Sequence, residues 1–187
     1  RPAATPAASK PAGAVTLTND NINSGSTIIS GGAVLNLGNG GTGGSVGGGI
    51  SISSTGLLNV NRADTLTISQ TISGAGGVTQ QGTGTLFLNR PNSYTGATTI
   101  NAGLLQLGLG NAIPASSAVI LANVAGATLD LNNFNDTIFS LAGGGTSGGN
   151  VTLGNGVLTT GNTTSTTYSG VISGTGSITK AGTGTFT

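Results

Sequence analysis

Residues 72–86 read Ile72-Ser-Gly-Ala-Gly-Gly-Val-Thr-Gln-Gln-Gly-Thr-Gly-Thr-Leu86, and residues 172–186 read Ile172-Ser-Gly-Thr-Gly-Ser-Ile-Thr-Lys-Ala-Gly-Thr-Gly-Thr-Phe186. The two stretches align without a gap, nine of the 15 positions are identical, and Leu86/Phe186 is a conservative exchange. Both copies combine aliphatic residues, threonines and regularly placed glycines. An internal repeat of this kind indicates stacked units that bury a continuous core between neighbours.

The same pattern continues outside the repeat. Aliphatic residues alternate with Ser or Thr in Ile50-Ser-Ile-Ser53, Leu66-Thr-Ile-Ser69 and Asn150-Val-Thr-Leu153. A period of two predicts half-buried strands, and the intervening Gly and Asn residues predict turns. Ser116–Asn123 is the single segment for which we expect a short helical turn.

Pairs of aliphatic residues recur along the chain at unequal steps of roughly 20–30 residues, which are typical of a solenoid. Steps of this length leave room for three short strands and three turns per rung. The predicted fold is therefore all-β, a parallel β-helix (β-solenoid) of about seven rungs with like residues stacked in columns. The series comprises Leu35/Leu37, Leu58/Val60, Leu86/Leu88, Leu105/Leu107 and Leu129/Leu131, and more loosely Leu158 and Phe186.

The domain organisation follows from a change in composition near the start of the chain. Residues 1–14 form a Pro/Ala-rich segment with three of the five prolines, which predicts an extended leader or linker. Residues 15–187 are expected to form the β-helix, with a full repeat at 72–108 and a truncated repeat at 172–187. Because the chain begins at Arg1, we expect a processed or excised product.

Half-repeats lie near both ends of the chain, because Val15–Gly25 aligns with Leu86–Gly96 in a constant register. One interpretation is a window cut from a longer solenoid. The other is that the last rung of one copy receives the first rungs of another, since an uncapped solenoid end exposes unpaired backbone groups. The candidate self-association edge then comprises Gly182, Thr183, Gly184, Thr185, Phe186, Thr187, Val15 and Leu17.

Residues 72–108 closely resemble the passenger-associated transport repeat of bacterial autotransporter passengers, through the glycine-rich stretch quoted above and Asn92-Ser-Tyr-Thr-Gly-Ala-Thr-Thr-Ile100. Residues 127–143 resemble the segment that commonly follows it, and Tyr168-Ser-Gly-Val-Ile-Ser-Gly174 resembles the start of the next repeat. The resemblance covers about residues 66–187, whereas 15–65 fit only as generic rungs. Arg90-Pro91 departs from the small residues usual at this place.

This resemblance implies a right-handed parallel β-helix that is secreted across the outer membrane by a translocator barrel, which is not part of this chain. It also implies a bacterial cell-surface or extracellular location. The repeat of that family is associated with export and folding rather than with catalysis. Membership therefore predicts a partner in the outer membrane and no enzymatic site.

The composition argues against several other classes of function. The net charge is +1 with only 5% charged residues, which leaves no basic stripe for nucleic acid. No Cys or His is present, so disulfides, catalytic triads and most metal sites are not expected. No apolar run is long enough for a membrane-spanning helix. Gly38–Gly43 matches GxGxxG, but no helical pattern follows, so we expect no cofactor.

An enzyme acting on polysaccharides would need clustered carboxylates in a groove. The chain has four, Asp20, Asp64, Asp130 and Asp136, and the alternation around Asp130 predicts that it faces outward. Tyr94 and Tyr168 each precede Thr/Ser-Gly and are expected to cover corners of a rung, or to form adhesive contacts from exposed loops. These residues predict no catalytic site.

The sequence thus favours a secreted, non-enzymatic surface protein, a passenger segment that acts as a stalk or scaffold. One alternative is a subunit of an extracellular filament, joined to itself end to end by strand addition. A further alternative is an adhesin that binds a host protein or glycan through loops near Gly38–Gly49 and Gly143–Asn150. A carbohydrate-active enzyme is the remaining alternative.

Overall fold

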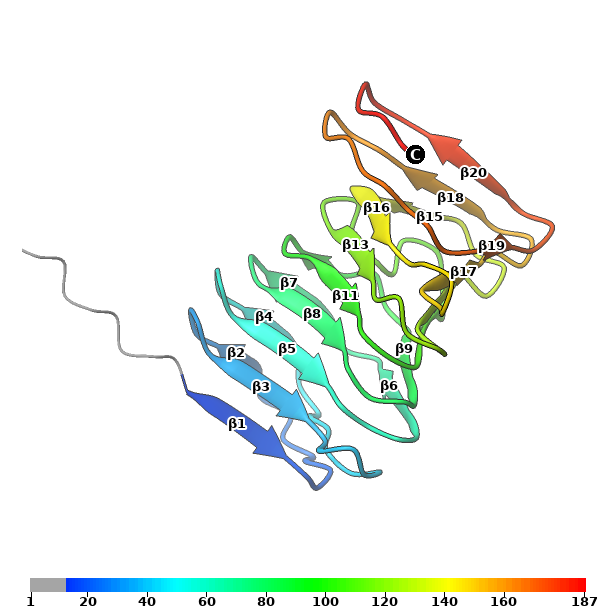
Figure 1. Ribbon diagram of the computed structural model, residues 1–187. Helices are drawn as coiled ribbons and strands as arrows, with labels where there is room; N and C mark the ends of the chain where they lie inside the picture. The colour runs from blue at the N-terminus through cyan, green and yellow to red at the C-terminus, as the bar shows by residue number, and fades with distance from the viewer. Residues whose placement is uncertain (1–12) are drawn as a thin grey trace, which may run out of the picture.

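The computed structural model describes residues 13–187, and every regular element in this range is a β-strand. All pairs of named strands are parallel, and together they build a β-solenoid of about eight turns, close to the seven rungs predicted (Figure 1). The predicted all-β parallel solenoid is confirmed. The predicted leader, residues 1–14, lies outside the described residues except at its last two positions, and the first strand begins at Ala14.

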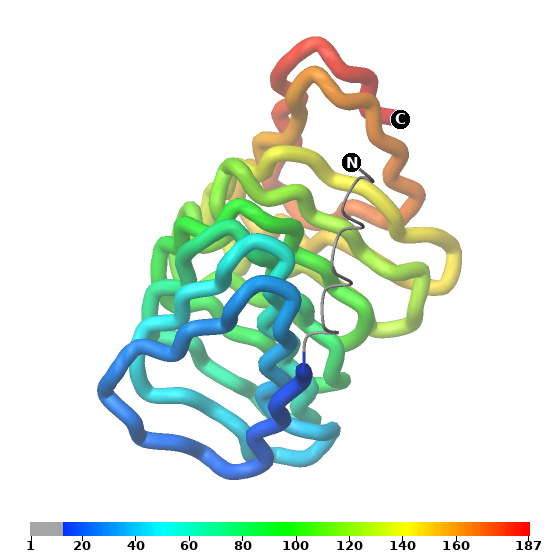
Figure 2. Tube along the Cα trace, turned by 90° about the vertical axis from the view of Figure 1, so that its left-hand side faces the viewer, coloured from blue at the N-terminus to red at the C-terminus, as the bar shows by residue number. Residues whose placement is uncertain are grey.

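Three faces run along the solenoid, and the chain visits them in a constant order (Figures 1 and 2). Face 1 is a sheet of β1 (Ala14–Leu17), β3 (Val34–Leu37), β5 (Leu57–Val60), β8 (Gly77–Gln80), β11 (Thr98–Ile100), β13 (Ala118–Leu121) and β16 (Ser140–Gly143). Face 2 is a sheet of β6 (Thr65–Ile68), β9 (Thr85–Leu88), β12 (Leu104–Leu107), β14 (Thr128–Asp130), β17 (Asn150–Thr152) and β19 (Ile172–Ser173).

Face 3 consists of two sheets that follow one another along the solenoid axis. The first contains β2 (Thr27–Ile29), β4 (Ile50–Ile52), β7 (Ile72–Gly74) and β10 (Ser93–Tyr94); the second contains β15 (Asp136–Ile138), β18 (Val157–Thr160) and β20 (Ser177–Lys180). Residues 112–117 lie between them without forming a strand. Side chains bridge this interruption, because Asn92 Nδ2 donates to Ala112 O and Asp136 Oδ2 accepts from Ile113 N.

The core is a set of apolar columns inside the three faces. On face 2, direct stacking in register joins Leu66, Leu86, Leu105, Leu129 and Val151, all of which are buried. Burying one such side chain stabilises a fold by about 1.5–3 kcal/mol, so a narrow core of small aliphatic residues suffices when it repeats in every turn. Residues 13–187 contain no helix that could cross a lipid bilayer.

The expected helical turn at Ser116–Asn123 is wrong. Residues Ala118–Leu121 form β13, which pairs with both β11 and β16 on face 1. Val119 and Leu121 are both buried, two residues apart, which is the strand periodicity and not that of a helix. Pairing with strands on both sides therefore decided the conformation of this segment.

The predicted series of aliphatic pairs does not form a single column. Its shorter steps connect stacked partners, such as Leu35 with Leu58 and Leu86 with Leu105. Each of its longer steps instead moves the series to the next face. Leu58 lies on face 1, Leu86 on face 2 and Leu158 on face 3. The longer steps therefore contain one turn and one additional side of the solenoid.

The two copies of the long repeat likewise lie on different faces of the solenoid. Ile72 lies in β7 on face 3, whereas Ile172 lies in β19 on face 2. Both copies nevertheless need glycine at the same position, because Gly74 and Gly174 have φ values of +101° and +118°. A Cβ at Gly84 would collide with the carbonyl of Asp64 in the turn before it. The repeat thus encodes the path of one turn, not a particular face.

Candidate self-association ends

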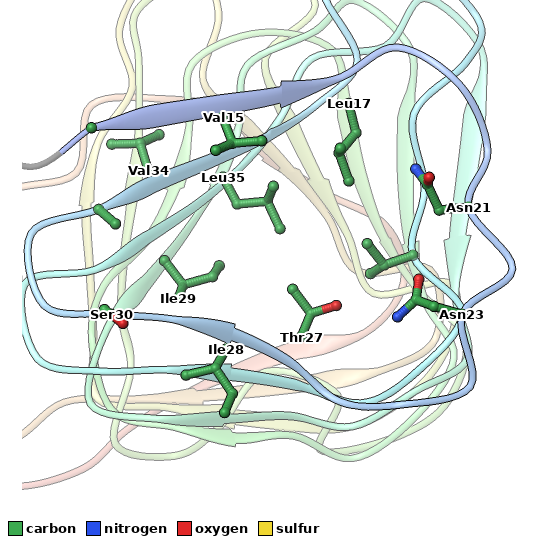
Figure 3. A pocket seen from close by; sticks show the side chains of 13 residues that line it. Val15, Leu17, Asn21, Asn23, Thr27, Ile28, Ile29, Ser30, Val34 and Leu35 are labelled. Carbon is green, nitrogen blue, oxygen red and sulfur yellow. The ribbon is translucent and has the colours of Figure 1, made fainter.

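The first turn of the solenoid is open at its outer side. It contains a cavity of about 510 Å³ (Figure 3). The side chains of Val15, Leu17, Ile29 and Leu35 point into this cavity. Val15 is 58% exposed, because no preceding turn covers it within the described residues. The lining residues are Gly13, Val15, Leu17, Asn21, Asn23, Thr27, Ile28, Ile29, Ser30, Ala33, Val34, Leu35 and Val46.

Face 2 has no strand in the first two turns, where the Asp20–Ser45 bridge takes its place. An ionic cluster holds this weakly paired side together. Arg62 donates to both carboxylate oxygens of Asp64 at 2.8 Å and to Asp20 Oδ1 at 3.0 Å, and also bonds Gly44 O. Three successive turns are thereby joined through one guanidinium group.

The electrostatics of the cluster follow its hydrogen bonds. The pKa of Asp20 is lowered by its bonds to Ser45 and Arg62, and the pKa of Asp64 is lowered chiefly by its bonds to Arg62. The Arg62 side chain is only 7% exposed, whereas the side chains of Asp20 and Asp64 are 61% and 39% exposed. The cluster is therefore a clamp between turns, with its carboxylates toward solvent.

The last turn carries the other half of the candidate edge, Gly182–Thr187. Its backbone bonds to the preceding turn through Gly184 N to Asn162 O, Thr187 N to Thr166 O and Tyr168 N to Thr187 O. Phe186 is half-buried and packs against the core. The outer edge of this segment has no partner within residues 13–187.

The structure does not bring the two halves of the candidate edge together within one chain. Val15 and Leu17 belong to β1 at the first turn, whereas Gly182–Thr187 lie at the last turn (Figure 1). Phe186 stacks on Tyr168 of the preceding turn. Self-association through these residues would require contact between two copies.

The carboxylates considered for catalysis lie apart. Asp130 faces outward from β14 and accepts from Gln106 Nε2 and Asn132 N, both at 2.8 Å. Asp136 is instead buried inside the solenoid, so the two do not share a groove. Among residues 13–187, no group of three or more acidic, His or Cys side chains is placed to hold a metal ion. The glycines of 38–43 lie in bends and irregular backbone, and no helix follows.

The core also contains a polar cluster that the sequence pattern did not predict. Tyr94, expected at a corner, is fully buried, and its hydroxyl lies 2.6 Å from Thr98 Oγ1, which in turn lies 2.8 Å from Ser117 Oγ. Burial raises the pKa of Asp136 to about 7, and its Oδ1 has no hydrogen-bond partner. The alternation Asp136-Thr-Ile138 could have predicted the burial of Asp136, because it places the carboxyl on the same side as buried Ile138.

Comparison with known proteins agrees with this architecture. The model of the passenger-associated-transport-repeat family matches residues 12–37 and 78–107. Over 134 residues the chain is 40% identical to the adhesin BmaC autotransporter of Brucella suis biovar 1 (strain 1330). This stretch covers 70% of the present chain but only 4% of that relative. No solved structure matches the chain.

The chain carries passenger-associated transport repeats on a parallel β-solenoid. Together with the similarity to an autotransporter adhesin, these repeats support a surface passenger segment of an autotransporter. The match at residues 12–37 corrects the expectation that residues 15–65 are only generic rungs. The first open turn is therefore built from the same repeat as the middle of the solenoid.

Proposed function

We propose that this segment is a non-enzymatic stalk or scaffold within a secreted bacterial surface protein. The observation that carries the proposal is the uninterrupted stacking on face 1, where seven strands pair in parallel from β1 to β16. Each turn contacts only its neighbours, so such a rod resists bending along its whole length and holds flanking parts of the protein apart.

The expected partner in secretion is an outer-membrane translocator barrel outside this chain. The passenger-associated transport repeats and the similarity to an autotransporter adhesin support this partner and a location on the bacterial surface or outside the cell. Small-angle X-ray scattering of the purified chain tests the stalk. We expect a rigid, elongated monomer, and no turnover of polysaccharide substrates. A compact particle or measurable turnover would contradict the proposal.

A second candidate is a filament subunit that associates with itself end to end. The apolar cavity at the first turn favours it, as does the unpaired outer edge of Gly182–Thr187. A contact between unlike ends does not close on itself and therefore grows fibres. Electron microscopy over a concentration series tests this, with Val15→Asp and a deletion of residues 182–187 compared with Ile120→Asp on the outside of face 1. Fibres that persist in both edge variants, or isolated rods at all concentrations, would exclude the filament.

A third candidate is an adhesin, because the similar protein from Brucella suis is named as one. In that case the loops at 38–49 and 143–150 are the expected contact regions. Within these stretches Asn39–Thr42 and Thr146–Ser147 are exposed, whereas Val46 is part of the core.

A further inference from the structure

Face 3 is interrupted between its two sheets, the first of which ends at β10 and the second of which begins at β15. The turn between them passes along face 3 as residues 111–117, which we call the gap segment. Faces 1 and 2 continue past this position, because β11 pairs with β13 and β12 pairs with β14 (Figure 1). At this position the interruption therefore affects one of the three sides of the solenoid.

Side chains join the gap segment to the turn before it. Asn92 Nδ2 donates to Ala112 O at 2.8 Å. Ser117 Oγ donates to Gly96 O, also at 2.8 Å. Pro114 has no N–H group, so it cannot donate to a backbone ladder. The position of the gap segment therefore depends on individual side-chain bonds, whereas the strands of face 3 are joined to one another by backbone pairing.

A carboxyl group lies at the contact between the gap segment and the turn after it. At one end of this contact, Phe139 N donates to Ser117 O at 3.0 Å. Further along, Ile113 N donates to Asp136 Oδ2 at 3.3 Å, so that a side-chain carboxyl accepts where a ladder would use a backbone carbonyl. Asp136 is 2% exposed, and its Oδ1 has no hydrogen-bond partner. One buried carboxyl group therefore helps to hold the second sheet of face 3 against the gap segment.

The surroundings of Asp136 contain no cation to pair with it within residues 13–187. The neighbouring strand β18 places Leu158 beside it, and the gap segment contributes Ile113. The titratable group that faces it is the hydroxyl of Tyr94 on β10, whose pKa is raised by burial and further by Asp136. Burial accordingly raises the pKa of Asp136 to about 7. The basic side chains bond elsewhere, Arg62 to Asp64, Arg90 to Ser69 O and Lys180 to Gly182 O.

We propose that the gap segment is a pH-sensitive closure of face 3, which stays shut while Asp136 is protonated and opens locally when Asp136 ionises. Burying a neutral carboxyl costs far less free energy than burying a carboxylate that has no cation beside it. Opening hydrates the carboxylate and breaks few bonds, because side chains make the bonds to the preceding turn. Faces 1 and 2 keep their ladders, so the rod stays continuous. The proposal is independent of the stalk, filament and adhesin candidates.

Hydrogen exchange of the wild-type chain at pH 5 and pH 7, corrected for intrinsic exchange rates, tests the proposal. The open form releases the proton of Asp136 throughout this range, so we expect the protection of residues 111–117 and 135–139 to fall by about tenfold or more. Low concentrations of denaturant separate local opening from unfolding, because only unfolding exposes enough surface to respond. Exchange in the gap segment should be insensitive to denaturant and faster than exchange in β13 and β14.

Two variants assign the effect to one carboxyl group. Asp136→Asn cannot ionise, so protection of the gap segment should be the same at both pH values. Asp130→Asn is the matched control, because it changes an outward carboxylate on β14, and it should keep the pH dependence of the wild type. The proposal is overturned if protection of the gap segment is equal at pH 5 and pH 7, if Asp136→Asn retains the difference, or if the gap segment exchanges only together with β13 and β14. The wild-type comparison decides by itself where Asp136→Asn fails to fold.

Discussion

Phe186 stacks on Tyr168, with ring centroids 6.5 Å apart and ring planes inclined by 16°. The two residues come from the last two turns of face 1, since Tyr168 bridges to Gly143 and Phe186 bridges to Thr166. The Tyr168 hydroxyl is bound to Gly149 O. The stack thus fastens the turn that contains Phe186 to a ring that is itself anchored.

Replacing Phe186 by Ala should loosen the last turn. The ring is half-buried, so we expect a loss of about 1–2 kcal/mol, below the cost for a fully buried Phe. Hydrogen exchange of residues 177–187 measures the local effect. Phe139→Ala, at a site 41% exposed, is the control and should leave this exchange unchanged. Equal protection in Phe186→Ala and wild type would contradict the anchoring role.

Asp136 should make the solenoid more stable in mild acid than at neutral pH. Burial raises its folded-state pKa to about 7, from 3.8 for an unperturbed carboxyl. Between these values the folded protein holds a proton that the unfolded chain releases. The contribution of Asp136 to stability is therefore largest below about pH 4 and falls as the pH rises to about 7, by an amount on the order of 4 kcal/mol.

Denaturant unfolding at several pH values measures this dependence. Asp136→Asn cannot ionise, so its stability should change much less across the same range. A wild-type stability that rises from pH 4 to 7, or an unaltered pH dependence in Asp136→Asn, would show that the carboxyl is not held protonated.

Arg62→Ala should destabilise the first three turns, because it removes the one side chain that bonds Asp20, Gly44 and Asp64. The carboxylates remain partly exposed and retain contact with water, so the expected cost is about 1–2 kcal/mol. Arg90→Ala is the matched control, since Arg90 makes a single exposed bond to Ser69 O and its loss should cost less than about 0.5 kcal/mol. Limited proteolysis near residues 18–26 reports on the opening, and similar cleavage of both variants would refute the clamp.

Gly84→Ala should be strongly destabilising, because its Cβ would meet the carbonyl of Asp64 in the neighbouring turn. We expect more than about 2 kcal/mol, since a backbone contact relaxes only by moving two turns apart. Gly25→Ala, where no atom lies within 4 Å of the new Cβ, should be neutral or slightly stabilising. Thermal unfolding of both variants is the measurement. Equal melting temperatures would show that the turns separate without cost.

Much of the fold was predictable because it depends on local pattern. The alternation in Ile50-Ser-Ile52 and Leu66-Thr-Ile68 predicts which side chains are buried, and those four aliphatic residues are in the core. The repeat predicted which residues form the candidate edge, but not how these residues pack. Phe186 was named as a member of this edge, and only the three-dimensional path of the chain brought the ring of Tyr168 against it.

The buried polar cluster could not be predicted from the sequence, for a different reason. Tyr94 and Thr98 are four residues apart across one corner, and the stacking of turns brings Ser117 of the next turn onto Thr98.

By itself, the sequence determined that the chain is a stack of short parallel strands, since alternation of period two and recurring glycines are properties of adjacent residues. Tertiary structure alone decided which face each repeat occupies. Ile72 and Ile172 have the same local sequence but lie on faces 3 and 2. The physical reason is that every face offers the same backbone ladder and the same apolar interior. The accumulated length of the intervening turns, and not the repeat, therefore sets its orientation around the axis.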